Sequence, residues 1–394
     1  AERRDESEAK VAVVSGPLPD PQSLVKPYDL LGDDLYRLAV YQTPDAVYLF
    51  VEFHHIVSDG ESDIIFLKDL NRAYAGEALE TETFTGFEVA LDEEAALKTD
   101  AFEKAKAHYD AIFAGCEPDT VPEDYAAEGQ TGLGRAKRTC AVSAKAVRSF
   151  CEKNGASVNA FFNAAFGFTL SRYANTTEAV YTTVYNGRND SRTMSSMSMF
   201  VKTLPILFRR TAEQKGSDAG RDMSQQIVGA MENDLFSFAD IVQAYGVKAD
   251  ILFVYQGEGF DVDRIGGEPG ERIPVELDRA KAKLQIEVGC QGDAFVLSTE
   301  YDTAFYTEKF VDGLTESLET TLAEFLEKTS VGDVDLCSAS CRKALYKFFG
   351  TVVPYDREKT VVELFREQAK AHPDHPCVVH LDTALTYREV DETS

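Results

Sequence analysis

Strand-like and helix-like stretches alternate along most of this 394-residue chain, and this alternation restricts its fold more than any other feature. Two stretches rich in β-branched and aromatic residues, 36–42 and 46–54, flank a Thr-Pro-Asp turn and predict a β-hairpin. Apolar residues then recur at helical spacing over 63–74. No repeat of fixed period is visible, so solenoids and propellers are excluded.

The same patterns continue after this hairpin and helix. Strands are expected at 136–142, 179–185, 200–208, 251–255, 284–288 and 295–301. Helices are expected at 104–113, 157–173, near 223–235, at 238–244 and at 307–326, with Ser157 as a cap. Mixed strands and helices over this length predict an α/β fold, an α+β sandwich with two lobes.

Charge and cysteine usage exclude several classes of function. Forty Lys and Arg stand against 67 Asp and Glu, a net charge of −27 that repels phosphate backbones and anionic lipids. We therefore expect no nucleic-acid partner and no membrane partner. Apolar stretches are too short to span a bilayer and the start does not resemble a signal peptide, so a cytoplasmic protein is predicted. Seven scattered cysteines without a CxxC pair predict neither disulfides nor a metal site.

A pair of adjacent histidines marks the candidate site. His54 and His55 end the second strand of the predicted hairpin and precede a helix. Because successive side chains of a strand alternate between its faces, we expect only one of the two imidazoles to face a given cleft. Asp59 is placed to cap the helix, and Gly60 to allow a tight turn.

Several segments resemble one known family. Residues 53–62 (FHHIVSDGES) are similar to the HHxxxDG signature of nonribosomal peptide synthetase condensation domains, which usually have Trp where this chain has Glu61. Further similar segments follow the family's order: 26–30 with 35–37, 84–87 with 108–109, 184–188, 199–205 and 300–305. In 199–205, Lys202 replaces the Asn of the FVNTLP motif. Residues 233–238 match their motif weakly, and an Arg-rich segment expected before 251–253 is missing.

The last residues have a likeness of their own. Segments 360–365, 372–376 and 385–389 resemble the entry to an adenylation domain, before any of its ATP-binding motifs. The resemblance implies two lobes like chloramphenicol acetyltransferase subunits. The first is expected to be incomplete, because His54 and His55 arrive after 53 residues. The expected domains are 1–80 (partial N-terminal lobe), 81–345 (C-terminal lobe), 346–359 (linker) and 360–394 (start of an adenylation domain).

The resemblance also implies a reaction and its residues. A condensation domain joins an acceptor amine to a donor thioester, each delivered on the 4'-phosphopantetheine arm of a peptidyl carrier domain, upstream or downstream. No cofactor would be bound directly, and the adenylation domain of the same chain would be a further partner. His55 is the implied catalytic residue, and His54, which faces away from it, is expected to pack or to bond the backbone. Asp59 and Arg188 are implied to form an ion pair that shapes the site, while a simple helix cap is the alternative role of Asp59.

Two other functions stay open at this point. A degenerate member of the family would only dock carrier or tailoring proteins, which the Glu61 replacement and the weak match near Phe236 suggest. An epimerization domain shares the fold and the histidine pair, but usually continues with a Trp-containing segment that is absent here.

Overall fold

The computed structural model describes residues 10–116, 122, 124, 131–211, 213–258, 264–273, 275, 280–328, 330–349 and 358–394. The chain divides into two compact units, residues 1–338 and residues 339–394. Among the described residues, no helix combines the length and the apolar character that crossing a bilayer requires.

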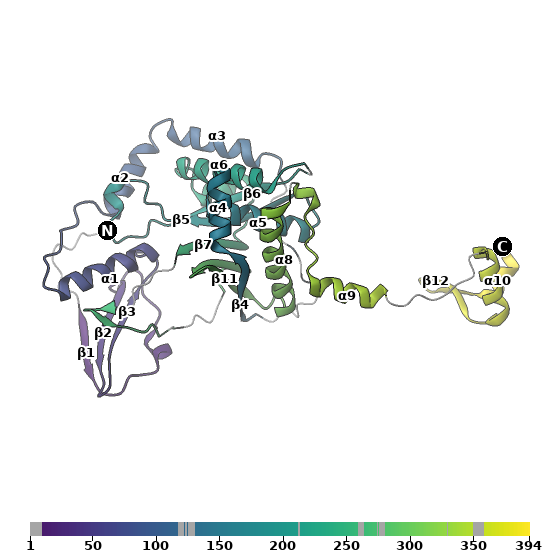
Figure 1. Ribbon diagram of the computed structural model, residues 1–394, viewed down its shortest axis with the longest axis horizontal. Helices are drawn as coiled ribbons and strands as arrows, with labels where there is room; N and C mark the ends of the chain where they lie inside the picture. The colour runs from purple at the N-terminus through teal and green to yellow at the C-terminus, as the bar shows by residue number, and fades with distance from the viewer. Residues whose placement is uncertain are drawn as a thin grey trace. The chain divides into compact units, whose positions relative to one another are not determined.

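The first unit begins with a small sheet, and residues 10–76 are called the small lobe here. Its strands are β1 (Val11–Ser15), β2 (Tyr36–Gln42) and β3 (Val47–Phe53), in the order β1-β2-β3. Strands β2 and β3 form the predicted antiparallel hairpin, and β1 adds in parallel to β2. Helix α1 (Gly60–Tyr74) follows, with the Phe66 ring edge-on to the Phe53 ring at 5.4 Å. The hairpin and helix predicted for this region are confirmed (Figure 1).

A six-stranded mixed sheet forms the centre of residues 131–338, called the large lobe here (Figure 1). Its strand order is β4-β11-β10-β7-β5-β6, in which β7 runs parallel to β5 and β10 and the other pairs are antiparallel. The strands are β4 (Leu133–Ser143), β5 (Glu178–Tyr185), β6 (Lys202–Arg209), β7 (Ile251–Glu258), β10 (Leu284–Gln291) and β11 (Ala294–Asp302). The predicted mixed α/β class is therefore confirmed.

The first unit has further helices beside α1, and several of them pack on the large sheet. They are α2 (Gly86–Ala96), α3 (Ala101–Phe113), α4 (Ala144–Asn154), α5 (Val158–Tyr173), α6 (Gly216–Glu232), α7 (Phe238–Tyr245) and α8 (Glu308–Glu327). A short ribbon, β8 (Arg264–Ile265) with β9 (Glu268–Pro269), reaches the small lobe. There the Asn71 side chain of α1 donates to the Arg264 carbonyl (3.1 Å) and accepts from the Gly266 amide (2.7 Å).

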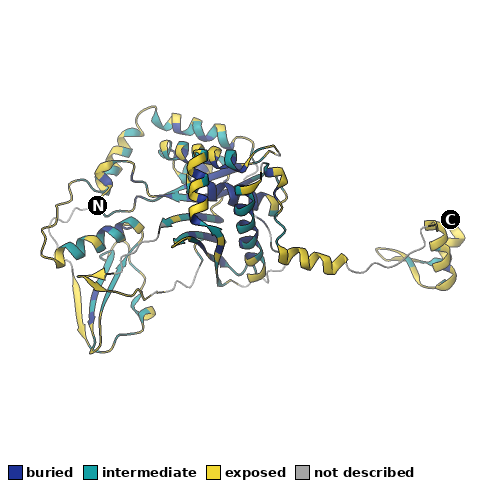
Figure 2. Cartoon of the chain, in the orientation of Figure 1, coloured by how far each residue is buried: buried dark blue, intermediate teal, exposed yellow. Residues whose placement is uncertain are grey.

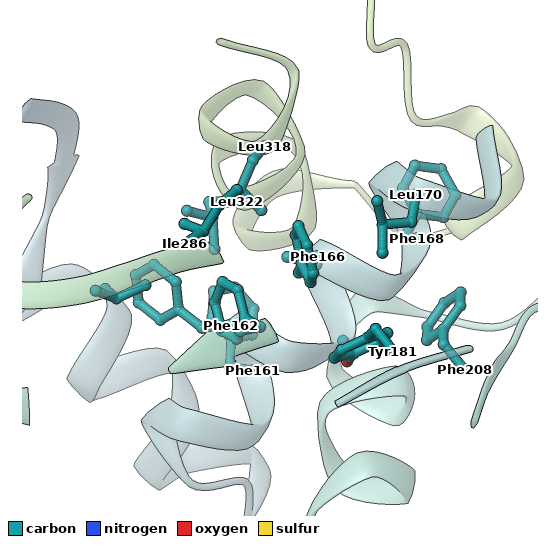
Figure 3. Close-up of a cluster of buried hydrophobic side chains, with 14 of the residues drawn as sticks. Phe161, Phe162, Phe166, Phe168, Leu170, Tyr181, Phe208, Ile286, Leu318 and Leu322 are labelled. Carbon is teal, nitrogen blue, oxygen red and sulfur yellow. The ribbon is translucent and has the colours of Figure 1, made fainter. Parts of the chain in front are cut away.

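Helix α5 is the centre of the core. Its sequence is apolar nearly all round, which is typical of a helix buried on every side. Phe161, Phe162 and Phe166 are fully buried (Figure 3). Phe166 stacks on Phe253 of β7 with ring centroids 4.6 Å apart. The Ser157 hydroxyl accepts from the Ala160 amide at 3.0 Å, so the predicted cap is confirmed.

Several predicted bounds were wrong for physical reasons. Strand β6 begins at Lys202 rather than 200, because the Phe200 amide donates to the Asp59 carboxylate instead of to a strand neighbour. Helix α6 begins at Gly216, before the predicted start near 223, and ends at Glu232. Helices α2 and α4 were not predicted, although the Thr85–Glu88 capping box marks the start of α2.

The second unit is a small helix-and-hairpin assembly. Its elements are α9 (Ala339–Phe349), α10 (Val361–Ala371), β12 (Pro376–His380), β13 (Thr383–Thr386) and α11 (Tyr387–Thr393). The rings of Phe365 and Tyr387 lie 5.7 Å apart, and Ala369 is buried, whereas most described residues of this unit are exposed (Figure 2). Of the predicted linker 346–359, residues 346–349 belong to α9 and residues 350–357 lie outside the described residues.

Candidate active site

His55 follows the end of β3 and is held by the turn that leads into α1. Its Nδ1 lies 2.6 Å from the carbonyl oxygen of Ser58. Because a carbonyl oxygen can only accept, Nδ1 must carry the ring proton, and Nε2 is then the basic nitrogen. The residue is exposed to solvent. A fixed tautomer with a basic nitrogen on an exposed ring can accept a proton from a bound molecule.

His54 makes different contacts from its neighbour. Its Nδ1 accepts from the Ile56 amide at 3.1 Å, and its ring lies edge-on to the Tyr28 ring with centroids 5.5 Å apart. The side chain is half-buried. The expectation that His54 packs and bonds the backbone is confirmed, and these contacts stiffen the turn that carries His55.

Asp59 and Arg188 form the predicted ion pair. Arg188 Nη1 lies 2.8 Å from Asp59 Oδ2, and Nη2 lies 3.0 Å from Oδ1, so the planar guanidinium meets both carboxylate oxygens. Both side chains have 0% exposed surface. The pair joins the turn after β3 in the small lobe to the segment after β5 in the large lobe, 129 residues further along the chain.

Asp59 also caps α1, so the alternative role predicted for it holds together with the ion pair. Its Oδ1 accepts from the Ser62 amide and from the Ser62 hydroxyl, each at 2.9 Å. Its Oδ2 accepts from the Phe200 amide at 2.9 Å. Burial opposes ionisation, but Arg188 and these amides outweigh it and hold the pKa of Asp59 below its usual value. One carboxylate therefore satisfies donors from three separate segments.

The Arg188 guanidinium is oriented by backbone carbonyls as well. It donates to the carbonyl oxygens of Asn186, Ser196 and Ser198 at 3.2–3.4 Å. Gly187, the residue before it, has φ +66°, and a Cβ there would lie 1.8 Å from the Phe200 carbonyl oxygen. Glycine is thus required at 187 both by its backbone conformation and by this close approach.

The role predicted for Gly60 was wrong. Gly60 is the first residue of α1, and its φ does not lie in the positive, left-handed region. Within the described part of the chain, a Cβ added at Gly60 would meet no atom within 4 Å. The change of direction is made by Asp59, which is extended (φ −129°, ψ 179°) and bonds the helix start. Backbone strain therefore does not demand glycine at position 60.

Acidic Asp63 lies close to the same turn. The Ser58 hydroxyl donates to Asp63 Oδ1 at 3.4 Å. Burial raises the pKa of Asp63 above its usual value, as does the neighbouring Asp59 carboxylate, against the opposing effect of the Ser58 hydrogen bond. The two acids of this turn thus have opposite environments: that of Asp59 favours the ionised form, and that of Asp63 the neutral form.

Sequence reasoning did not assign roles to three residues that complete the site: Ser62, Gly187 and Phe200. Each lies in a segment already noted for its family resemblance, so the motifs marked the positions but not the contacts. Among the described residues, no group of three His, Cys, Asp or Glu side chains is arranged to hold a metal ion.

Comparison with known proteins gives concordant matches. The sequence model of the family described as "Condensation domain" matches residues 21–346. Bacitracin synthase 1 of Bacillus licheniformis is 25% identical over 395 residues, covering 94% of this chain and 7% of that protein. Gramicidin S synthase 2 of Brevibacillus brevis is 25% identical over 387 residues, covering 93% of this chain and 9% of that protein. The chain thus spans less than a tenth of these two relatives.

Solved structures share the fold. A four-domain nonribosomal peptide synthetase bound to AMP and glycine aligns with TM-score 0.70 and 15% identity, covering 97% of this chain and 32% of that one. At this identity the likeness supports the fold alone.

Proposed function

Since this chain belongs to the condensation domain family, we propose that it forms an amide bond between two substrates held as thioesters on carrier domains. The acceptor amine attacks the thioester carbonyl carbon, the C–N bond forms, the C–S bond breaks, and the amine proton passes to the leaving thiolate. His55 accepts that proton or hydrogen-bonds the amine. The observation that carries the proposal is the His55 ring, fixed through Nδ1 on Ser58 with Nε2 as the basic nitrogen.

Comparison of two free energies indicates that positioning of the substrates contributes more to the reaction rate than deprotonation of the amine. An α-amine with pKa near ~8 is about one-tenth neutral at pH 7, a cost of only about 1.4 kcal/mol. Holding amine and thioester in attack geometry can supply about 7–11 kcal/mol. The contacts that fix the turn, above all Asp59 with Arg188, therefore matter as much as the base.

The domain organisation and partners belong to the same proposal. Residues 1–80 and 81–345 are the two lobes, 346–359 a linker, and 360–394 the start of an adenylation domain. Upstream and downstream peptidyl carriers would deliver the substrates on phosphopantetheine arms, and the protein would work in the cytoplasm.

The proposal is tested in the intact parent synthetase by replacing His55. His55→Ala should abolish dipeptide formation while both carriers still load, as followed by mass spectrometry of the carrier-bound species. His55→Asn keeps a donor toward the Ser58 carbonyl but lacks a basic nitrogen, so it should be as inactive. His372→Ala, in the second unit, is the matched histidine control.

Near wild-type condensation by both His55 variants would refute the proposed chemistry. If wild type forms no dipeptide but still captures a loaded carrier, the docking function is favoured. If the donor instead exchanges its α-hydrogen with solvent deuterium, the protein is an epimerization domain.

A further inference from the structure

A cavity of about 470 Å³ lies away from the histidine turn, at the start of β6. It is lined from α2 by Glu93, from α3 by Tyr109, from β6 by Lys202 and Leu204, and from the segment before and into α7 by Asp234 and Phe236. The volume lies within the ~300–1,000 Å³ range of small-molecule sites. His55, Asp59 and Arg188 are not among the lining residues.

The polar side of the cavity is a cation between two anions. Lys202 Nζ lies 2.5 Å from Glu93 Oε1 and 3.1 Å from Asp234 Oδ2. Asp234 also accepts from the Tyr185 hydroxyl. Burial disfavours the charged form, yet the two carboxylates outweigh it and hold the pKa of Lys202 above its usual value. Lys202 therefore stays an ammonium ion at neutral pH.

These charges do not balance. A further lining carboxylate, Asp240, accepts from the Ser237 amide and hydroxyl at the start of α7, where the helix dipole favours an anion. Glu93, Asp234 and Lys202 then leave one negative charge in excess. Two carboxylates offer about eight lone-pair sites, so they can accept from a second ammonium group beside that of Lys202.

Apolar side chains make up much of the remaining lining, beside Tyr109, Thr203 and Ser237. Leu97, Leu204, Leu235, Phe236 and Phe238 all line it. A ligand that fits must therefore combine one positive charge with an apolar body, since an anion would meet the excess negative charge and a purely apolar molecule would leave that charge uncompensated.

We propose that this cavity binds a primary ammonium group carried on an apolar body about the size of an aromatic amino-acid side chain. The site is additional to the amide-forming residues and goes beyond the proposed function. One short segment connects the two sites. The Phe200 amide donates to Asp59 at the histidine turn, and Lys202, two residues after Phe200, lines the cavity.

Calorimetric titration of the 394-residue chain with 2-phenylethylamine tests this, with 3-phenylpropionate as the anion of matched size. The amine should bind and the carboxylate should not. Glu93→Gln should weaken amine binding about tenfold, because one charge-assisted hydrogen bond is lost. Lys202→Met should strengthen it, since the competing cation is removed. Glu94→Gln, at the neighbouring α2 residue that pairs with Lys98 instead, should leave binding unchanged.

Leu97→Trp offers a test that does not alter charge. Leu97 is 49% exposed, so a larger side chain is tolerated by the fold while it fills the cavity, and amine binding should be lost. Equal or tighter binding of 3-phenylpropionate, an unchanged affinity in both Glu93→Gln and Leu97→Trp, or no amine binding by folded wild type would each overturn the proposal. Condensation is not measured, so failure here is distinct from failure of the amide-forming function.

Discussion

The large and small lobes bury their strands to very different degrees. In β5 of the large lobe, residues 179–183 are all buried, and α5 is buried almost along its whole length (Figure 2). In the small lobe, Ala39 and Tyr41 are buried in β2, while β1 and β3 contain exposed or half-buried residues throughout. The candidate base His55 belongs to the lobe with the thinner core.

This contrast indicates how the site is held. The small sheet buries too little to fix the turn after β3 by packing alone, and the turn is instead fixed by directed polar contacts. Asp59 receives hydrogen bonds from Arg188 and Phe200 of the large lobe and from Ser62 of its own helix. Contacts from the large lobe therefore hold the turn of the small lobe that carries His55.

The largest expected effect comes from breaking that connection. Asp59→Ala should lower the free energy of unfolding by about 3–5 kcal/mol, because the buried Arg188 guanidinium is left without its countercharge, and should also abolish condensation. Asp59→Asn, which keeps an acceptor, should be milder. Denaturant unfolding of the two variants beside wild type measures this. A loss of only about 1 kcal/mol in Asp59→Ala would match the loss of a helix cap alone, and would contradict the claim that the ion pair with Arg188 holds this turn.

Acid should weaken the same contact without a mutation. An Asp in the unfolded chain titrates near ~3.9, and the folded pKa of Asp59 is lower, so the unfolded state binds the proton more readily. The stabilisation is therefore fully present above about pH 5 and is lost as the pH falls below about 4 through the folded pKa. The difference in unfolding free energy between wild type and Asp59→Asn should be constant from about pH 7 to 5 and shrink toward about pH 3. A difference independent of pH would refute this assignment.

A matched pair of valines compares the two sheets directly. Val288 of β10 is 0% exposed, whereas Val40 of β2 is half-buried. Val288→Ala should cost about 2 kcal/mol and Val40→Ala less than about 1 kcal/mol, in proportion to the apolar surface withdrawn from water. Chemical denaturation of both variants, followed with the same spectroscopic probe, measures the two losses of unfolding free energy. Equal costs would mean that the small lobe is packed as well as the large one.

The smallest effect is expected at Asp63, and its sign is opposite. Because the folded pKa of Asp63 is raised, its ionised form is disfavoured in the native state, and stability is lost as the pH rises through the titration of this group. Asp63→Asn should therefore leave the protein as stable or slightly more stable at about pH 7, with the gain vanishing below about pH 4. Thermal melts at these two pH values test this, with Asp69→Asn on the same helix as control. A clear destabilisation at neutral pH would contradict the assigned environment.

Much of the fold could be predicted because its signals are local. The hairpin at 36–54, helix α5 with its Ser157 cap and the strand pattern of the large sheet follow from periodicity and capping chemistry within short windows. The start of β6 could not be found this way. The Phe200 amide donates to a carboxylate 141 residues away instead of to a neighbouring strand, and no local sequence pattern indicates this long-range contact.

For the site, the sequence by itself determined the residue types: adjacent histidines at a strand end, an acid before a helix, and an arginine after a later strand. Through motif resemblance it also determined which distant partners to test. Tertiary structure decided that Asp59 is cap and ion pair at once, that Gly187 rather than Gly60 is the glycine the backbone requires, and that Lys202 lines a charged cavity. The physical reason is that propensity and periodicity act between neighbours in sequence, whereas desolvation, close backbone approach and charge balance depend on which segments meet in space.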